Sequence, residues 1–559
     1  MAKKTIKLAS LVAGEKKAIT NAQLVRAQVL KDRTVFNLEA IGRNYKLNQA
    51  YRSVRNLQLT DNRGRKLETF KDYQLTFKKF LDLVPLISEK KRPSYPAGES
   101  YLNTRTLLRH YRGHVLVLVH KDVYQQIKDR IDRYVLDLGR DQFWATIHVY
   151  NGGTPSYIRS YIKARNPKGV VMVGAIPPAW FEMSDDFHGS ASEFPCDLYY
   201  MDTNATWTDS DADGKFNAVS GHVTPEIWLG RLWTPTLNGN DPTLLNNYFD
   251  RNHRFRTGDL GHSRSALAYV DDDWTGFDDC EMDQMTPAAY ITKYTNPDIT
   301  DADLYKTEIN RSRSFVQVCS HSSPHVHSFR VPSSSTTEYI ETAYFRDQRA
   351  PNAHFFNLFC CSSARFTTSE YIGGWYIFDK AGGETNTGLT AVGSTKTGSM
   401  LFFADFYKPI GEGNCIGDAM IDWWRARGGD HDLGERQWFY GMSILGDPTL
   451  GWWKGAVPRP IAPAEGSVFN HYPRTMTFSW QPVSIPGATY SIEIDAHGAV
   501  RAGQWAAESF QTFSVHHNLT GTSFNHNFVG AQPGRWRVRA KIGDRYCNWS
   551  EWQYFRFTI

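Results

Sequence analysis

Two short apolar segments of this chain each end on a side chain that can take part in nucleophilic catalysis. Residues 315–320 lead to His321, and residues 353–360 lead to Cys361. Runs of aromatic and β-branched residues of this length predict buried strands of a largely parallel sheet. Ligand sites in open α/β sheets lie outside the carboxyl ends of the strands, so we expect the imidazole and the thiol to form a dyad.

The elements that must position this dyad alternate between strands and helices. Strands are predicted at residues 114–119, 145–150, 170–174, 226–230, 266–270 and 390–393, and helices at residues 123–138, 158–164 and 419–427. Strand, helix, strand in this rhythm implies right-handed crossovers and a parallel sheet. We therefore predict an α/β domain over residues 101–455, with a mostly parallel sheet flanked by helices.

Other patterns precede and follow this α/β region. Short alternating segments separated by basic turns predict a small β-rich N-terminal module over residues 1–100. After a proline-rich linker, residues 464–559 contain short alternating strands with Trp480 early and the sequence WSEW late. This pattern predicts a C-terminal β-sandwich of the fibronectin type III kind.

The net charge of +5 hides an uneven distribution along the 559 residues. Residues 1–100 carry 21 Lys and Arg against 9 Asp and Glu, so the rest of the chain is net acidic. A basic module could attract nucleic acid, but it carries no recognised motif, and we do not expect a nucleic-acid partner. The seven Cys are odd in number and widely spread, which argues against a disulfide framework.

No apolar stretch reaches the roughly 20 residues that a membrane-spanning helix needs, so we expect no membrane span. Residues 8–14 are apolar, but they are too short and too soon followed by charged residues to resemble the core of a signal peptide. The residues alone therefore leave the compartment open.

Residues 110–455 resemble the gingipain-type cysteine peptidases, which share the caspase-like fold with legumains and separases. The likeness rests on His321 and Cys361 at consecutive strand ends and on the segments VMVG at 171–174, DLYY at 197–200, PEIWLGR at 225–231, GSTKTG at 393–398 and GDPTL at 446–450. The resemblance implies a caspase-like fold, endopeptidase activity on protein or peptide substrates, a trailing fibronectin-like module and secretion.

The resemblance also implies a role for each residue of the site. Cys361 would attack the scissile carbonyl, and His321 would protonate the departing amine. Asp273 is the best match, among three consecutive Asp, for an acid that orients the imidazole. The backbone N–H groups of Cys361 and Ser322 would receive the oxyanion, with Ser322 standing where these peptidases usually have glycine. Strand alternation points Cys360 to the opposite face, which makes it the weaker candidate for the nucleophile.

Substrate preference is predicted from acids in the loop that follows residue 270. Gingipain-like proteins often cleave after a basic residue held by such an acid, and we expect Asp283 first, then Asp279, to bind a basic P1 side chain. A merely solvated acidic loop is the alternative. A basic-specific peptidase could also cut the basic turns of residues 1–100, which would make that module a pro-segment.

The sequence DSDADGKF at 209–216 is typical of a calcium-binding loop. Its alternating oxygen ligands would come from Asp209, Asp211, Asp213, the backbone of Lys215, and Asn217. The twelfth position is Ser220 instead of a bidentate Glu, so we expect structural calcium bound without EF-hand helices. The alternative is a solvated acidic turn.

Two further alternatives differ in class from the peptidase. His321, His325 and His327 could gather zinc, but the last two follow Pro324 in a predicted loop and no HExxH pattern is present, so we expect surface exposure or substrate contact for them. A caspase-like scaffold without activity could instead hold a protein or carbohydrate through its aromatic surface and sandwich. Preferential reaction of Cys361 with a thiol-directed probe would distinguish an active site from such a scaffold.

Overall fold

The computed structural model describes residues 5–7, 58–60 and 112–558, apart from gaps at 142, 262, 278, 381–385, 484, 486, 498–504, 506–513, 529 and 543–544. In the N-terminal region it contains β1 (Thr5–Lys7) and β2 (Gln58–Thr60), which pair in parallel. The rest of the β-rich module predicted for residues 1–100, and its role as a pro-segment, lie outside the described residues.

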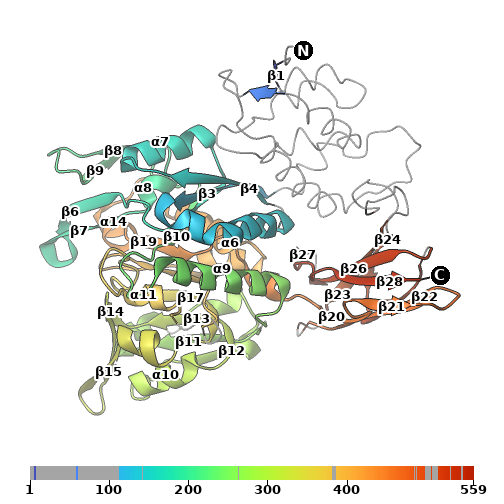
Figure 1. Ribbon diagram of the computed structural model, residues 1–559. Coiled ribbons are helices and arrows are strands. Elements are labelled where there is room, and N and C mark those ends of the chain that lie inside the picture. Colours follow the sequence, from blue (N-terminus) through green and yellow to red (C-terminus); the bar gives the residue numbers. More distant parts are fainter. Residues whose placement is uncertain are drawn as a thin grey trace.

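A ten-stranded sheet forms the centre of the described part of the chain (Figure 1). Its strands are β3 (Gly113–His120), β4 (Phe143–Tyr150), β5 (Gly169–Val173), β10 (Trp228–Leu232), β11 (Ala266–Val270), β12 (Ile291–Tyr294), β13 (Arg313–Cys319), β17 (Ala353–Phe359), β18 (Thr390–Ser394) and β19 (Met442–Gly446). They lie in the order β12-β11-β13-β17-β18-β19-β10-β5-β3-β4.

The sheet is mostly parallel, as the sequence predicts. Strands β4, β3, β5 and β10 are parallel to their neighbours in that group. Strands β12, β11, β13, β17 and β18 form a second parallel group, and β19 is antiparallel to β18. Strands β5, β11, β13 and β17 are buried along their whole length, which explains why their sequences are mostly apolar and do not alternate strictly between apolar and polar residues.

Helices connect the strands and cover the sheet. Their bounds are α6 (Lys121–Arg140), α7 (Pro155–Arg165), α8 (Leu198–Met201), α9 (Asp241–Thr257), α10 (Ala302–Ile309), α11 (Ile372–Trp375), α12 (Phe403–Gly411), α13 (Ile416–Arg427) and α14 (Leu433–Phe439). Helices α6 and α9 pack against each other in front of the sheet in the view of Figure 1, and α12 packs against α13. Helix α6 buries Ile127, Ile131, Tyr134 and Leu138, which share one face of the helix at spacings of three and four.

A buried ion-pair network ties α9 to the segment after β19. The Arg256 side chain, 3% exposed, pairs with Asp141 and with Asp447, whose carboxylate oxygen lies 2.6 Å away. Arg256 also donates to Thr449 Oγ1 at 2.7 Å. Asp447 and Thr449 belong to the GDPTL segment, so this part of the motif holds helix and sheet together at a distance from the predicted dyad.

Small hairpins lie at one side of the large sheet. They consist of β6 (Trp180–Asp186) with β7 (Ser190–Pro195), β8 (Thr206–Thr208) with β9 (Ala218–Ser220), and the three-stranded sheet β14 (His321–Ser323), β15 (Val326–Val331) and β16 (Thr336–Glu341). Figure 1 places these hairpins on the side away from the C-terminal strands.

The C-terminal region contains two further sheets. One consists of β20 (Arg459–Ala462), β22 (Thr475–Gln481) and β25 (Ser523–Asn527), and the other of β21 (Ser467–Phe469), β23 (Thr489–Ala496), β24 (Ser514–Leu519), β26 (Pro533–Ile542), β27 (Arg545–Tyr546) and β28 (Gln553–Phe557). Phe478, Trp480 and Trp536 are buried in a cluster that draws on both sheets. Asn548 Nδ2 donates to the carbonyl of Arg256 at 3.2 Å, which joins this region to α9.

Candidate active site

Three neighbouring strands end at the same level of the sheet. Val270 of β11 lies opposite Cys319 of β13, and Cys319 lies opposite Phe359 of β17. The ladder continues one residue further, because Asp271 N–H donates to the Cys319 carbonyl at 2.9 Å and Ser320 N–H donates to the Phe359 carbonyl at 3.2 Å. Segments carrying an Asp, a His and a Cys therefore leave the sheet side by side.

The structure brings His321 and Asp273 together. Nε2 of His321 lies 2.8 Å from Oδ2 of Asp273, and both side chains are about half exposed. Asp273 belongs to the 3-10 helix η3 (Asp272–Phe277), which follows β11 and turns this carboxylate toward the imidazole. The other carboxylate oxygen lies 3.9 Å from Arg330 of β15. With Nε2 held by Asp273, Nδ1 is the ring nitrogen left for a thiol.

Cys361 begins a tight turn after β17 and is the one Cys of the seven that is not buried. Ser362 adopts a left-handed backbone conformation with φ of 54°, which is uncommon for a residue other than Gly. Its N–H donates to the carbonyl of Lys396 at 2.8 Å, and Ala364 N–H donates to the carbonyl of Ser394 at 2.9 Å. The turn that carries the thiol is thus fixed to the end of β18 and to the segment that follows it.

Cys360 has a different environment from its neighbour. Its side chain is 1% exposed, and burial raises the pKa of this thiol to about 12. The Cys360 Sγ lies 3.5 Å from the hydroxyl of Ser320, inside the protein. A thiol with these properties stays protonated at neutral pH, so Cys361 is the better placed nucleophile of the pair.

A buried cation lies close to this turn. Lys396 is 2% exposed, and its Nζ lies 2.8 Å from Asp186 Oδ1 and donates to the Gln437 carbonyl at 2.6 Å. Burial lowers the pKa of Lys396, and the hydrogen bond and the charge of Asp186 act on it in the opposite direction. The GSTKTG segment contains Lys396, but sequence alone gives this residue no part in the site, because its partner Asp186 comes from the distant β6.

Ser322, predicted to supply an oxyanion donor, lies in β14 opposite His327 of β15. Its hydroxyl donates to the carbonyl of Val326 at 2.9 Å, so the side chain is engaged within the hairpin. The prediction that His327 lies in an exposed loop is wrong. His327 is buried in β15 and lies 3.0 Å from the hydroxyl of Tyr376, and burial lowers its pKa to about 3.

His325 lies in the turn before β15, with Nε2 at 2.8 Å from the carbonyl of Ser369. His321 faces Asp273 and His327 is buried, so the three imidazoles have separate partners. In the described part of the chain they are not among the groups of side chains that could together hold a metal ion.

The three consecutive Asp, which sequence alone could not separate, have distinct positions. Asp271 is fully buried, and its Oδ2 accepts the N–H of Arg330 at 3.1 Å. Burial raises the pKa of Asp271 to about 7. Asp272 lies 3.6 Å from the Arg330 guanidinium. Only Asp273 pairs with His321 among the described residues, so it is the carboxylate able to orient the ring.

Asp279 and Asp283, predicted to bind a basic P1 side chain, are both exposed in the loop after β11. Asp283 belongs to the 3-10 helix η4 (Met282–Gln284). Within the described residues neither carboxylate forms a hydrogen bond or ion pair; Lys293 instead bonds the backbone carbonyl of Asp279 at 2.9 Å. The preference for a basic P1 residue stays a prediction.

The predicted calcium loop lies between β8 and β9 and contacts β6. Carboxylate oxygens of Asp211 and Asp213 lie within 4.8 Å of each other and of Glu182, a β6 residue that the sequence did not suggest. Asp209 instead accepts backbone N–H groups of the loop, from Ala212 at 2.7 Å and Gly214 at 2.9 Å.

The remaining predicted calcium ligands have partners of their own. Asn217 Nδ2 lies 3.3 Å from Glu182 and 3.2 Å from Asp211, so it borders the three carboxylates. The Lys215 ammonium pairs with Glu193 and with Asp213, at 3.2 Å from the latter. Three clustered carboxylates next to an amide are ligands suited to a hard cation such as calcium.

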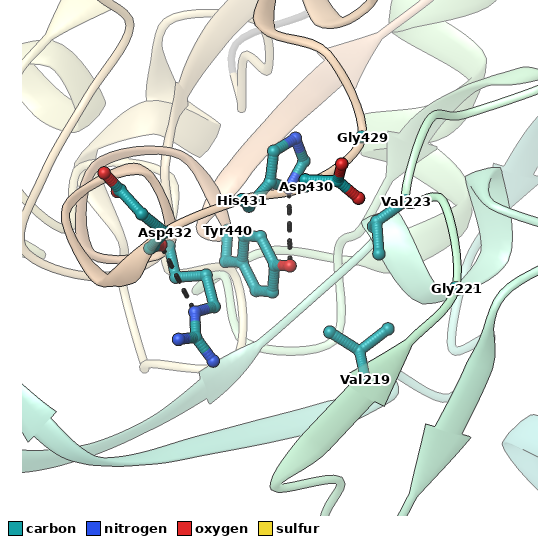
Figure 2. Close-up of a pocket in the computed structure, with 9 residues that line it drawn as sticks. Val219, Gly221, Val223, Gly429, Asp430, His431, Asp432 and Tyr440 are labelled. Atoms are coloured by element: carbon teal, nitrogen blue, oxygen red, sulfur yellow. Dashed lines mark hydrogen bonds between the residues drawn. The ribbon is translucent and has the colours of Figure 1, made fainter.

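A separate hollow of about 330 Å³ lies between the end of β9 and the segment that leads into α14 (Figure 2). It is lined by Val219, Gly221, Val223, Gly429, Asp430, His431, Asp432, Arg436 and Tyr440. His431 Nδ1 lies 3.4 Å from the Tyr440 hydroxyl, and a dashed line marks this contact in Figure 2. No predicted site residue lines this hollow.

Among the residues that the structure describes, none of the helices has the length and apolar character required to span a membrane.

Comparison with known proteins gives weak structural similarities. No family model and no curated protein matches the sequence. Dimeric latent PorU from Porphyromonas gingivalis is 10% identical over 79% of this chain and 43% of that chain, with a TM-score of 0.27. An Fn3-like protein from Clostridium thermocellum is 16% identical over 18% of this chain and 92% of that one, with a TM-score of 0.13. The fibronectin type-III domain of human fibronectin type III domain containing protein 3 is 16% identical over 18% of this chain and 85% of its own, with a TM-score of 0.14.

Proposed function

We propose that this protein is a cysteine endopeptidase with a caspase-like catalytic domain and a C-terminal β-sandwich. The observation that carries the proposal is the 2.8 Å contact between His321 Nε2 and Asp273. The strands that precede these two residues, β13 and β11, end at the same level of the sheet as β17, which leads to Cys361. A Cys, a His and an orienting acid are the groups that an activated thiol nucleophile needs. The turn of Cys361, fixed by the segment after β18, holds the thiol in one place.

In the proposed reaction His321 takes the proton of the Cys361 thiol, and Sγ forms a bond to the scissile carbonyl carbon. The backbone N–H groups of Cys361 and Ser322 stabilise the oxyanion. The C–N bond then breaks as the imidazolium gives its proton to the departing amine, which leaves a thioester. Water attacks the thioester as it gives a proton to His321, the C–S bond breaks, and the carboxylic acid product leaves. The imidazolium then returns its proton to Sγ of Cys361, which restores the thiol.

The test is hydrolysis of a fluorogenic peptide library that varies at P1, with the wild type and Cys361→Ala compared in reductant and calcium. We expect cleavage that the variant lacks, with Arg or Lys favoured at P1 if Asp283 or Asp279 binds that side chain. Cleavage with no basic preference would remove those two acids from the site. An absence of cleavage by the wild type would favour the alternative, a scaffold without activity that binds protein or carbohydrate.

We also propose that the loop at 209–217 binds structural calcium. Support comes from Glu182, whose carboxylate lies within 4.8 Å of those of Asp211 and Asp213. A carboxylate from β6 would fill the role that Ser220, at the twelfth loop position, cannot. Bound calcium would join this loop to the β6 and β7 hairpin, which also carries the Asp186 partner of Lys396.

A further inference from the structure

The hollow drawn in Figure 2 has two unlike walls. One wall is apolar and contains Val219 of β9 and the buried Val223. The other wall is polar, with His431 and Tyr440, whose side chains face the two valines across the hollow in Figure 2. The volume of about 330 Å³ is at the lower end of the roughly 300–1,000 Å³ that small-molecule sites occupy. The hollow therefore suits a small ligand.

The backbone joins the two walls. The N–H of Val223 donates to the carbonyl of Gly429 at 2.9 Å. Gly429 has no room for a side chain, because a Cβ there would clash with the imidazole of His222. Gly221 has a φ of 98°, in the left-handed region that favours glycine, and turns the chain from β9 toward Val223. The shape of the hollow is thus set by a backbone hydrogen bond and two glycines.

Most polar groups of the lining already have hydrogen-bond partners. Nε2 of His431 lies 3.1 Å from the carbonyl of Gly428, so it carries a proton and donates it. Burial lowers the pKa of His431, which keeps the ring neutral at neutral pH and leaves Nδ1 as the acceptor for the Tyr440 hydroxyl. The carboxylate of Asp432 accepts the N–H of Glu435 at 2.8 Å at the start of α14. These groups are therefore engaged within the protein.

Two charged side chains of the lining keep most of their hydrogen-bonding capacity. Within the part of the chain that the structure describes, the carboxylate of the exposed Asp430 forms no hydrogen bond and no ion pair. The Arg436 guanidinium forms one hydrogen bond there, from Nε to the backbone carbonyl of Asp432 at 3.3 Å, and no ion pair. Two carboxylates against one guanidinium leave the lining with a net negative charge, which disfavours a ligand that is only an anion.

We propose that this hollow binds a small zwitterion with an apolar side chain, either an amino acid or a dipeptide. The ligand carboxylate pairs with the guanidinium fork of Arg436, and the ligand ammonium pairs with Asp430. The ligand side chain packs against Val219 and Val223. A ligand with both charges leaves neither Asp430 nor Arg436 unpaired when the hollow loses its water, whereas a cation or an anion alone would leave one of them unpaired. Binding does not depend on the proposed dyad, so it is separate from the proposed peptidase activity.

The experiment measures binding to the full chain by isothermal titration calorimetry. The probes are L-leucine and leucyl-leucine, each also as its C-terminal amide, which lacks the carboxylate, and as its N-acetyl derivative, which lacks the ammonium. Glycine is the probe without an apolar side chain. The proteins are the wild type, Arg436→Gln, Asp430→Asn and a control, Arg425→Gln. Arg425 is an exposed Arg of α13 that does not line the hollow and lies 3.4 Å from Asp422.

We expect saturable binding of L-leucine or leucyl-leucine to the wild type, and the tighter of the two identifies the length of the ligand. Its amide, its N-acetyl derivative and glycine should bind roughly tenfold more weakly or less, because each lacks one of the proposed contacts. Arg436→Gln should remove the preference for the zwitterion over its amide, and Asp430→Asn should remove the preference over the N-acetyl derivative. Arg425→Gln should bind like the wild type.

The wild type alone can overturn the proposal, so the result does not depend on how well the variants fold. Absence of saturable binding of both zwitterions would overturn it, as would equal affinity for a zwitterion, its amide and its N-acetyl derivative. Affinity for the zwitterion that is unchanged in both Arg436→Gln and Asp430→Asn would also overturn it, because the ligand would then bind elsewhere on the protein.

Discussion

Nε2 of His321 lies 2.8 Å from Oδ2 of Asp273, although 48 residues separate them in the sequence. The contact exists because β11 and β13 are parallel neighbours that end in register, with Val270 opposite Cys319. The first turn of η3 then directs the third of three consecutive Asp toward the ring. This arrangement engages Nε2 of the imidazole, so the proposed dyad would use Nδ1.

Asp273→Asn should lower kcat/KM by roughly 100-fold or more, because an amide neither holds the imidazole as well nor stabilises its charged form. The measurement is steady-state hydrolysis of the best substrate from the library. Asp279→Asn, which changes an exposed acid of the same loop, is the matched control and should stay close to the wild type if its carboxylate is only solvated. Activity of Asp273→Asn equal to that of the control would contradict the assignment.

Alkylation by iodoacetamide at neutral pH should modify Cys361 well before the other six Cys, all of which are buried. The neighbouring Cys360, with a pKa raised to about 12 by burial, should resist as long as the protein is folded. Peptide mapping by mass spectrometry after short exposure measures this directly. Cys361→Ser should abolish the fast phase and Cys360→Ser should keep it; the reverse pattern would exclude Cys361 as the reactive thiol.

The buried carboxyl of Asp271 should make stability depend on pH. Burial raises its pKa to about 7 in the folded protein, above the value of about 3.9 in the unfolded chain. The folded state then binds the proton more tightly, so this group's contribution to the free energy of unfolding falls between about pH 4 and pH 7 and is constant at higher pH.

Asp271→Asn removes that titration. The free energy of unfolding of both proteins is measured by urea denaturation. The value for Asp271→Asn minus the value for the wild type should increase as pH rises from about 4 to 7. A difference between the two proteins that does not change with pH would show that Asp271 is ionised in the folded state throughout this range.

Lys396→Met should destabilise the protein by roughly 3–5 kcal/mol, because it leaves the carboxylate of Asp186 buried without its cation. Denaturant unfolding of Lys396→Met, Asp186→Asn and the double variant provides the test. The double variant should be more stable than Lys396→Met, since it removes both charges. If the losses of stability in the two single variants add up to the loss in the double variant, the ion pair is not the reason for the destabilisation.

Calcium should raise the Tm of the wild type, and Glu182→Gln should weaken this effect, because an amide is a poorer ligand than the carboxylate for a hard cation. Glu193→Gln is the control, since Glu193 pairs with Lys215 and is not one of the three clustered carboxylates. Thermal unfolding with calcium or with chelator measures the shift. An identical calcium response in Glu182→Gln and the control would contradict the proposed ligand set.

The strands that lead to the proposed dyad could be predicted from sequence because burial on both faces of a parallel sheet makes a strand mostly apolar, as around Phe315 and Phe355. The predicted strand at 226–230 was displaced by two residues, to Trp228–Leu232. Residues that reach the site from elsewhere could not be predicted. Glu182 and Asp186 belong to a hairpin whose docking depends on tertiary contacts, and no local pattern marks them.

His327 is a residue whose environment the sequence predicted wrongly. Its position after a Pro indicated an exposed loop, but β15 continues the hairpin and buries the ring against Tyr376. A single His gives no periodic signal that distinguishes a strand from a turn, so tertiary structure decided its environment.

The most direct test of the central claim is a double-variant cycle on peptide hydrolysis with the wild type, Cys361→Ala, His321→Ala and the double variant. If the thiol and the imidazole act as one unit, each single substitution should remove nearly all of kcat/KM and the double variant should lose no more than either. Hydrolysis that survives in Cys361→Ala, or losses that add, would contradict a Cys361–His321 dyad.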